Sequence, residues 1–520
     1  MKSKFNKLCI VFVSLLAAAT TTIALSGCGG QDAAENSAGA NTVFGTSNLQ
    51  DGQAATEANK SARLSESDID VNETISNDED GGHAIVADDE SLNYSKVLVT
   101  KTGDDEGDEA DFYGENAAIL AENGGALTLS SMVVKSDGEH ANGVFCCGDG
   151  SEINISDSYI KTEGNFSGGI MTTGGGTMNA KNLTIETSGD SSAAIRSDRG
   201  GGTVNVSGGY YSTSGTGSPV IYSTADITVS DAEMVSAASQ GVVVEGKNSV
   251  TLNNVTLTAD NNTHNSDKTD YFQAVMIYQS MSGDAEKGLS AFSMNGGKLV
   301  NKNGDVFFVN NTSTEINLDN VSITNEGDGV FLRAAASGWG TPDLNGGQVI
   351  LNASNQTITG NIVVDDISTL NLYLKSYSGF TGAINPTGYD GEVYVELEKG
   401  STWSLTADSY IYALTCTQNS IKLNGHKLYV DGKEYSEGKV SQGSEFFIDE
   451  ASSAEKQETT SGGEASQKLA IPQEIPTEGS NPDEDPHERD GGDPHEKGFQ
   501  EDSNSPEMDL LLNPDKYENP

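Results

Sequence analysis

Cysteine and proline are scarce in this 520-residue chain. Of its 5 cysteines, Cys9 and Cys28 fall in the first 28 residues, which leaves Cys146, Cys147 and Cys416. So few cysteines exclude a disulfide-stapled scaffold. A disulfide between the adjacent Cys146 and Cys147 would be strained, so both are expected to remain thiols. Most of the 11 prolines lie after residue 450, so the middle of the chain has few breaks in regular structure.

Basic residues are also in short supply, with 29 Lys and Arg against 77 Asp and Glu and a formal net charge of −48. Such a charge disfavours nucleic acid and anionic lipid as ligands. It also disfavours a polyanionic polysaccharide, because the two negative charges repel each other. We find no zinc-binding motif, nucleotide-binding loop or serine-triad motif. After the first 28 residues, no apolar run is long enough to span a bilayer.

The first 28 residues have the organisation of an export signal. Lysines near the N-terminus precede an apolar run over 8–24, and Leu25-Ser26-Gly27-Cys28 resembles a bacterial lipobox. The resemblance implies cleavage before Cys28 and acylation of that cysteine, which predicts an extracytoplasmic protein that is anchored to the bacterial cell membrane and exposed at the surface. The alternatives are an ordinary secretory signal with an incidental cysteine, or an uncleaved anchor.

Two acidic, apolar-poor stretches flank the middle of the chain. Residues 29–91 and 450–520 have too little apolar surface to fold alone, which predicts a disordered tether and a disordered, proline-containing tail. The β-structured region is therefore expected over 92–449, with an N-terminal cap at 92–116 and a C-terminal cap from about 390 to 449. Trp403 and Tyr410 are expected to seal the C-terminal end of the core.

A short sequence repeat occurs nine times between residues 117 and 354. Its most regular part is a strand-like triplet, and successive triplets end 26, 25, 27, 23, 22, 43, 23 and 27 residues apart. A period in this range indicates a solenoid. The triplets are Met132–Val134, Ser158–Ile160, Leu183–Ile185, Tyr210–Ser212, Glu233–Val235, Val255–Leu257, Lys298–Val300, Val321–Ile323 and Gln348–Ile350.

Each repeat contains two further strand-like pieces with alternating apolar and polar residues, separated by Gly, Asn and Asp pairs. Three strands per coil of about 25 residues predict an all-β, right-handed parallel β-helix with coils stacked about 4.8 Å apart. A sandwich or propeller would need hairpin turns and would not produce this period. One inward ladder is expected to hold Val134, Ile160, Ile185, Val235, Leu257, Val300, Ile323 and Ile350.

The interval of 43 residues predicts an insertion. It divides into two excursions, over 259–273 and 279–289, and a third excursion follows at 333–344 with Trp339. Loops that leave a rigid solenoid commonly carry its binding function. Whether Trp339 reaches the other two excursions is left open.

An acidic loop in the expected N-terminal cap is a candidate calcium site. Asp104, Glu106, Asp108 and Glu115 stand at offsets 1, 3, 5 and 12, as in an EF-hand loop. However, Glu109 occupies the position of the turn glycine, and no helices flank the loop. The alternative is a solvated acidic loop, and no other cofactor is expected.

Four phrases, 107–114, 168–176, 192–202 and 278–284, resemble a group of adhesin-like, pectin-lyase-like β-helix proteins exported by gut Firmicutes. The resemblance covers about residues 95–435. It implies a β-helix on a cell surface and supplies no catalytic residues.

The residues after the first strand of successive coils are expected to form an outward stripe at strand spacing. Aromatic rings and hydrogen-bonding groups in such a stripe would suit a sugar chain. The alternative is that the arginines neutralise local carboxylates while the tyrosines cover the coil edges. The candidate ligand-binding residues are Met171, Arg196, Asp198, Arg199, Tyr222, Glu245 and Tyr278.

Three hypotheses of function follow. A monomeric surface adhesin that binds a glycan or a host or matrix surface requires an exposed aromatic or arginine patch. A polysaccharide lyase or glycoside hydrolase requires carboxylates that converge in a groove, and a purely structural surface protein requires neither. We favour the adhesin, because fold resemblance alone does not give an activity.

Overall fold

A computed structural model of the chain describes residues 63–449. The export signal with Cys28, the predicted tether up to residue 62 and the predicted tail lie outside the described residues. Two short helical turns, η1 (Glu66–Asp68) and η2 (Glu109–Tyr113), interrupt a β structure. No helix between residues 63 and 449 is long and apolar enough to cross a membrane.

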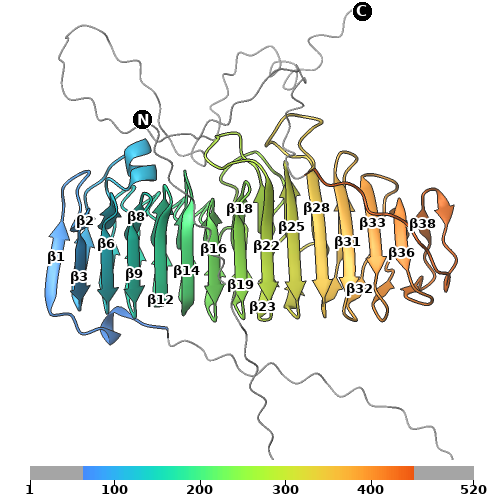
Figure 1. The fold of residues 1–520 in the computed structure, drawn as a ribbon, viewed down its shortest axis with the longest axis horizontal. Coiled ribbons are helices and arrows are strands. Elements are labelled where there is room, and N and C mark those ends of the chain that lie inside the picture. The colour runs from blue at the N-terminus through green and yellow to red at the C-terminus, as the bar shows by residue number, and fades with distance from the viewer. Residues whose placement is uncertain (1–62, 450–520) are drawn as a thin grey trace, which may run out of the picture. The chain divides into compact units, whose positions relative to one another are not determined.

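The strands stack in chain order along three rows, which we call sheets 1, 2 and 3 (Figure 1). Sheet 3 has 11 strands. These are β2 (Ile85–Asp88), β5 (Ile119–Glu122), β8 (Val144–Cys147), β11 (Ile170–Thr173), β13 (Ile195–Ser197), β15 (Ile221–Ser223), β18 (Val242–Glu245), β21 (Gln273–Tyr278), β24 (Asp305–Asn310), β27 (Val330–Ala334) and β30 (Asn361–Val364). At its C-terminal end it is continued by β35 (Ser409–Ile411), β38 (Leu428–Val430) and β39 (Lys433–Glu434).

Sheets 1 and 2 join at a corner in each coil, and β12 and β14 run through that corner. Sheet 1 comprises β3 (Ser91–Ser95), β6 (Ala126–Ser130), β9 (Glu152–Ser156), the first halves of β12 (Gly176–Thr187) and β14 (Gly202–Thr213), β16 (Asp226–Ser230), β19 (Ser249–Asn253), β22 (Leu289–Asn295), β25 (Thr312–Asp319), β28 (Gly347–Ser354), β31 (Thr369–Lys375), β33 (Glu392–Leu397) and β36 (Ala413–Cys416). Sheet 2 comprises β1 (Glu73–Asn77), β4 (Val97–Lys101), β7 (Val133–Ser136), β10 (Tyr159–Thr162), the second halves of β12 and β14, β17 (Glu233–Ser236), β20 (Thr256–Ala259), β23 (Lys298–Asn301), β26 (Ser322–Asn325), and then β29 (Thr357–Thr359), β32 (Gly379–Thr381), β34 (Thr402–Ser404) and β37 (Ile421–Lys422).

Neighbouring strands within each row pair in parallel, one coil on the next. Only a connection that passes around the coil can join strands in this way. The fold is therefore the parallel β-helix that the repeat predicts.

The core contains one continuous ladder of apolar side chains inside sheet 2. Val134, Ile160 and Ile185 lie opposite one another, as predicted. The next positions are Tyr211, Met234, Leu257, Leu299 and Ile323.

The predicted ladder was therefore wrong at three positions. Val235 and Val300 each lie one residue after the inward position, and Ile350 lies in sheet 1 opposite Glu315. Side chains alternate between faces along a strand, so an error of one residue moves a side chain to the outer face.

The corner between sheets 1 and 2 explains the recurring Asn, Asp and Gly pairs. Asp157, Asn182 and Asn254 have φ angles of +48°, +51° and +54°. Asn and Asp adopt this left-handed conformation more readily than other non-glycine residues. The turn chemistry read from the sequence thus marks the point where each coil bends from one sheet to the next.

Three predicted boundaries are wrong. β1 and β2 lie in the expected tether and β3 begins at its last residue, so the solenoid begins ahead of residue 92. Residues 92–116 supply β4 to an ordinary coil, rather than forming a cap. In the expected C-terminal cap, β33 and β36 continue the stack before the antiparallel pair of β38 with β39 ends it.

Candidate functional site

The predicted stripe lies on the outer face of sheet 3, but its residues occupy two rows. Met171 lies opposite Arg196, and Arg196 lies opposite Tyr222. The next residue in that row is Val243, because Tyr222 pairs with it. Glu245 and Tyr278 face each other in the neighbouring row, two residues further along each strand.

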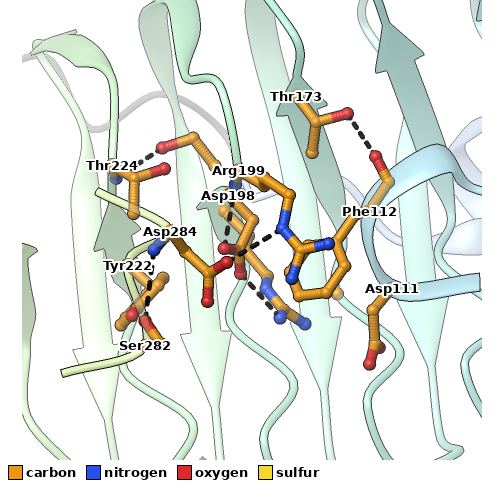
Figure 2. A network of polar contacts seen from close by, with 12 residues as sticks. Asp111, Phe112, Thr173, Asp198, Arg199, Tyr222, Thr224, Ser282 and Asp284 are labelled. Atoms are coloured by element: carbon orange, nitrogen blue, oxygen red, sulfur yellow. Dashed lines mark hydrogen bonds and ion pairs between the residues drawn. The ribbon is translucent and has the colours of Figure 1, made fainter. Parts of the chain in front are cut away.

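These side chains are buried, so the expectation of a solvent-exposed stripe is wrong. Arg196, Asp198 and Glu245 are 2%, 1% and 2% exposed, and Tyr222 and Tyr278 are buried as well. The physical reason is that side chains on the outer face of sheet 3 do not reach solvent here. A second layer of chain, which includes η2 and the excursions, lies over this face of the sheet (Figures 1 and 2).

Arg199 holds two of the covering segments (Figure 2). Its Nε donates to Asp284 Oδ1 at 2.8 Å, as Figure 2 shows. Its Nη1 donates to Asp108 Oδ2 at 3.1 Å. The guanidinium carbon lies 3.7 Å from the ring centroid of Phe112. Burial tends to lower the pKa of Arg199, but the hydrogen bonds to the two carboxylates outweigh it and raise that pKa.

The other arginine of the stripe forms a buried ion pair. Arg196 Nη2 donates to Asp198 Oδ2 at 2.9 Å, and Asp198 Oδ1 accepts from the backbone N–H of Arg199. Both guanidinium groups are thus engaged by carboxylates of the same chain. This geometry matches the alternative in which the arginines neutralise local carboxylates.

Two buried tyrosines converge on one carboxylate. The hydroxyls of Tyr222 and Tyr278 both donate to Glu245 Oε2, the latter at 3.1 Å. Burial, and then the charge of Glu245, raise the pKa of both phenols well above the usual value. Both tyrosines therefore remain protonated and act as donors. The two hydroxyls thus satisfy one oxygen of a buried carboxyl group, and the arrangement offers no ionised phenol as a nucleophile.

The four phrases that carry the family resemblance meet in this region. Asp108 and Phe112 come from the first, and Arg196, Asp198 and Arg199 from the third. The second supplies Thr173, whose Oγ1 donates to the carbonyl of Phe112 at 2.7 Å, and the fourth supplies Tyr278 and Asp284. The roles of Asp108, Phe112 and Asp284 were not predicted, although all three lie in segments that carry the family resemblance.

The calcium loop does not form. Asp108 turns towards Arg199, and Asp104 Oδ1 accepts the backbone N–H of Glu139 at 2.8 Å. Glu106 and Glu115 remain exposed. Among residues 63–449, no three or more His, Cys, Asp or Glu side chains are placed to hold a metal ion. The four predicted ligands therefore do not surround one point. They belong to a solvated loop in which Asp108 forms an ion pair with Arg199.

The third excursion does reach the first. The backbone N–H of Gly338 donates to the carbonyl of Lys268 at 2.7 Å. The ring of Trp339 lies edge-on to Tyr278 with 5.1 Å between centroids. Trp339 therefore does reach the first excursion, and the first and third excursions together cover β18, β21 and β24.

A cluster of tyrosines that sequence reasoning missed lies at the C-terminal end of sheet 3. Tyr410 of β35 stacks on Tyr429 of β38, with centroids 5.0 Å apart and planes 10° apart. Tyr389 packs against Tyr410 and Tyr412 at 5.2 and 5.3 Å. Tyr412 is 38% exposed, and Tyr389, Tyr410 and Tyr429 are half-buried. Tyr410 therefore does not seal the core as predicted, whereas Trp403 is fully buried in it.

Comparison of the chain with models of known protein families, with curated proteins and with solved structures finds no match.

Proposed function

We propose that this protein is a surface-displayed, adhesin-like binding protein that recognises a glycan. The observation that carries the proposal is the tyrosine cluster of Tyr389, Tyr410, Tyr412 and Tyr429. Among the hypotheses weighed, only the binding protein requires an exposed aromatic patch. Contiguous exposed aromatic groups of this kind mark interaction sites, and rings with an apolar body and a polar hydroxyl suit the mixed surface of a sugar.

The surroundings of the cluster favour a glycan over a strongly charged ligand. The backbone N–H of Gly432 donates to the hydroxyl of Tyr389 at 2.6 Å, which fixes that ring. Lys427 and Glu434 form an ion pair beside Tyr429, and Lys433 pairs with Asp431 close by. A rigid aromatic surface that carries both signs of charge at its edge offers stacking together with hydroxyl groups for hydrogen bonding.

A polysaccharide lyase or hydrolase is the less favoured function. It requires carboxylates that converge on a substrate groove, whereas Asp198, Asp284 and Asp108 are each engaged by an arginine. The tyrosine cluster contains no such carboxylate pair. Binding without catalysis therefore accounts for more of the observed geometry.

The proposal places the protein outside the cytoplasm as a lipoprotein. Acylation of Cys28 would anchor it to the bacterial membrane, and residues 29–62 would separate the solenoid from the lipid surface. The strand topology is compatible with the adhesin-like, pectin-lyase-like β-helix family, and we include membership of that family in the proposal. We propose a monomer whose partners are the membrane and a glycan or a host or matrix surface, with no nucleic acid and no cofactor.

A glycan array tests the proposal with the chain from residue 29 to residue 520. We expect the Tyr410→Ala/Tyr412→Ala double substitution to weaken glycan binding roughly tenfold, since aromatic contacts are worth about 0.5–1.5 kcal/mol each. Tyr377→Ala is the matched control, because Tyr377 is an isolated tyrosine that is 82% exposed. Equal binding by the double variant and the wild type would contradict the proposal.

A further inference from the structure

The first coil of the solenoid has an open edge in the part of the chain that the structure describes. There, β1, β2 and β3 each pair with one strand only, namely β4, β5 and β6. The opposite end differs, because β39 pairs antiparallel with β38, and Ser441 forms an antiparallel bridge with Cys416 of β36. An open strand edge is a template on which another strand can pair.

β3 is the part of this edge that lacks the usual protection against pairing. Its sequence, Ser91-Leu92-Asn93-Tyr94-Ser95, contains no charged residue and no proline. Natural edge strands commonly carry one or the other. Leu92 and Tyr94 pack against the core but are only half-buried. Covering this edge would therefore remove apolar side chains from water, which favours association.

The described chain ahead of β1 leads away from the open edge. It runs over the outer face of sheet 2, where Ile69 packs with Val133 and Tyr159. Arg63, the first described residue, lies over the ring of Tyr210 in β14, 4.1 Å from its centroid. From β1 to β14 the stack passes through β4, β7, β10 and β12, a distance of about 24 Å at the ordinary strand spacing. The occupant that we consider is therefore a second copy of the chain.

β3 is complementary to itself in its backbone hydrogen bonds. The N–H of Lys96 and the carbonyl of Glu90 both bond towards β6. Alternate residues of a strand direct their backbone groups to opposite sides, so those of Ser91, Asn93 and Ser95 point to the open edge. An antiparallel β3 from a second copy, centred on Asn93, would pair with all three residues.

The same register places complementary side chains opposite one another. Leu92 faces the second copy's Tyr94, and an aromatic and an aliphatic side chain form a favourable cross-strand pair. Just outside the strand, Glu90 faces the second copy's Lys96, and both residues are exposed. Two pairs of opposite charge would thus flank the paired strands and fix their register.

We infer that two copies of this chain associate reversibly, head to head, through antiparallel pairing of β3 about a two-fold axis. Each copy contributes the edge of a single coil, so the proposed monomer is the form at low concentration and the pair forms where copies are concentrated. The inference goes beyond the proposed function and does not require a glycan. The pair carries its two tyrosine clusters at opposite ends, which would allow bivalent binding.

Sedimentation equilibrium of the chain from residue 29 to residue 520 tests the inference. At about 0.15 M ionic strength, where charges are screened beyond about 8 Å, the average mass should rise from monomer towards dimer with concentration. Asn93→Pro removes an N–H that faces the open edge and leaves the pairing with β6 intact. We expect it to weaken association at least roughly tenfold, because each copy loses a hydrogen bond. Asn93→Ala keeps that N–H and is the matched control, which should associate as the wild type does.

A charge exchange tests the register independently of proline. Lys96→Glu places two carboxylates opposite each other and should weaken association roughly tenfold. Glu90→Lys/Lys96→Glu restores opposite charges and should associate to within about threefold of the wild type. The inference is overturned if the wild type stays monomeric at every concentration, if Asn93→Pro associates as the wild type does, or if the double variant is no better than Lys96→Glu. Those outcomes leave the glycan array test of the tyrosine cluster unaffected.

Discussion

Asp305 and Arg333 form a bidentate ion pair on the outer face of sheet 3. Arg333 Nε donates to Asp305 Oδ2 at 2.6 Å and Nη2 donates to Oδ1 at 3.2 Å. The guanidinium carbon also lies 4.0 Å from the ring centroid of Tyr271 in the first excursion. Burial raises the pKa of Asp305 from 3.8 to about 6, although Arg333 opposes the shift. Removing this carboxylate from water thus costs more than the ion pair returns.

This raised pKa predicts a pH dependence that Asp305→Asn removes. The folded state holds the Asp305 proton more tightly than the unfolded state, so this residue's stabilising contribution is present below about pH 4 and is lost as the pH rises to about 6. The free energy of unfolding of the wild type, relative to Asp305→Asn, should fall by about 2–3 kcal/mol between pH 4 and pH 7. Urea titrations of both proteins at the two pH values measure it. A constant difference between them would refute the expectation.

At the scale of single elements, the repeat was predictable and the covering layer was not. Strand triplets, corner residues such as Asn182 and the buried Trp403 follow from alternation and turn chemistry, which are local properties. The burial of Arg196 and Glu245 depends on η2 and the excursion after β21, which come from distant parts of the chain. No local sequence pattern indicates that these elements pack over the outer face of sheet 3. The residues were therefore predicted to form an exposed stripe.

Arg199 is the side chain that joins those distant elements, so we expect its loss to loosen both together. In Arg199→Ala, amide hydrogens in residues 107–114 and 279–288 should exchange roughly tenfold faster, equivalent to about 1.4 kcal/mol. The core strands should be unchanged. Hydrogen exchange followed by mass spectrometry of peptides resolves the two segments.

Lys247→Ala is a suitable control for that experiment. Lys247 pairs with Glu286 in the same excursion, but both side chains are largely exposed, and exposed pairs contribute little. Its exchange should match that of the wild type. If Arg199→Ala loosened only one of the two segments, Arg199 would not couple them.

Along the stacked strands of the solenoid, each coil pairs only with the coils next to it. Thr162 lies directly opposite Ser136 in the next coil, and the same one-coil offset recurs at Val144 and Ile170. In such a stack the energy is close to a sum of coil terms and interface terms. A cut that removes one whole coil should therefore bring equivalent positions together.

Deletion of residues 137–162 makes such a cut. It removes β8, β9 and β10, joins Ser136 to Glu163 and places Val134 opposite Ile185 in the inward ladder. We expect a folded β-helix with a single cooperative transition and a lower melting temperature, because one interface term is lost and the core pattern is kept. Deletion of residues 137–149 is the control, since half a coil shifts every later strand to the wrong sheet and should abolish folding. Thermal unfolding of both deletion variants, followed by circular dichroism, tests this expectation. If both variants folded with the same melting temperature, or if neither folded, the coil would not be the unit of stability.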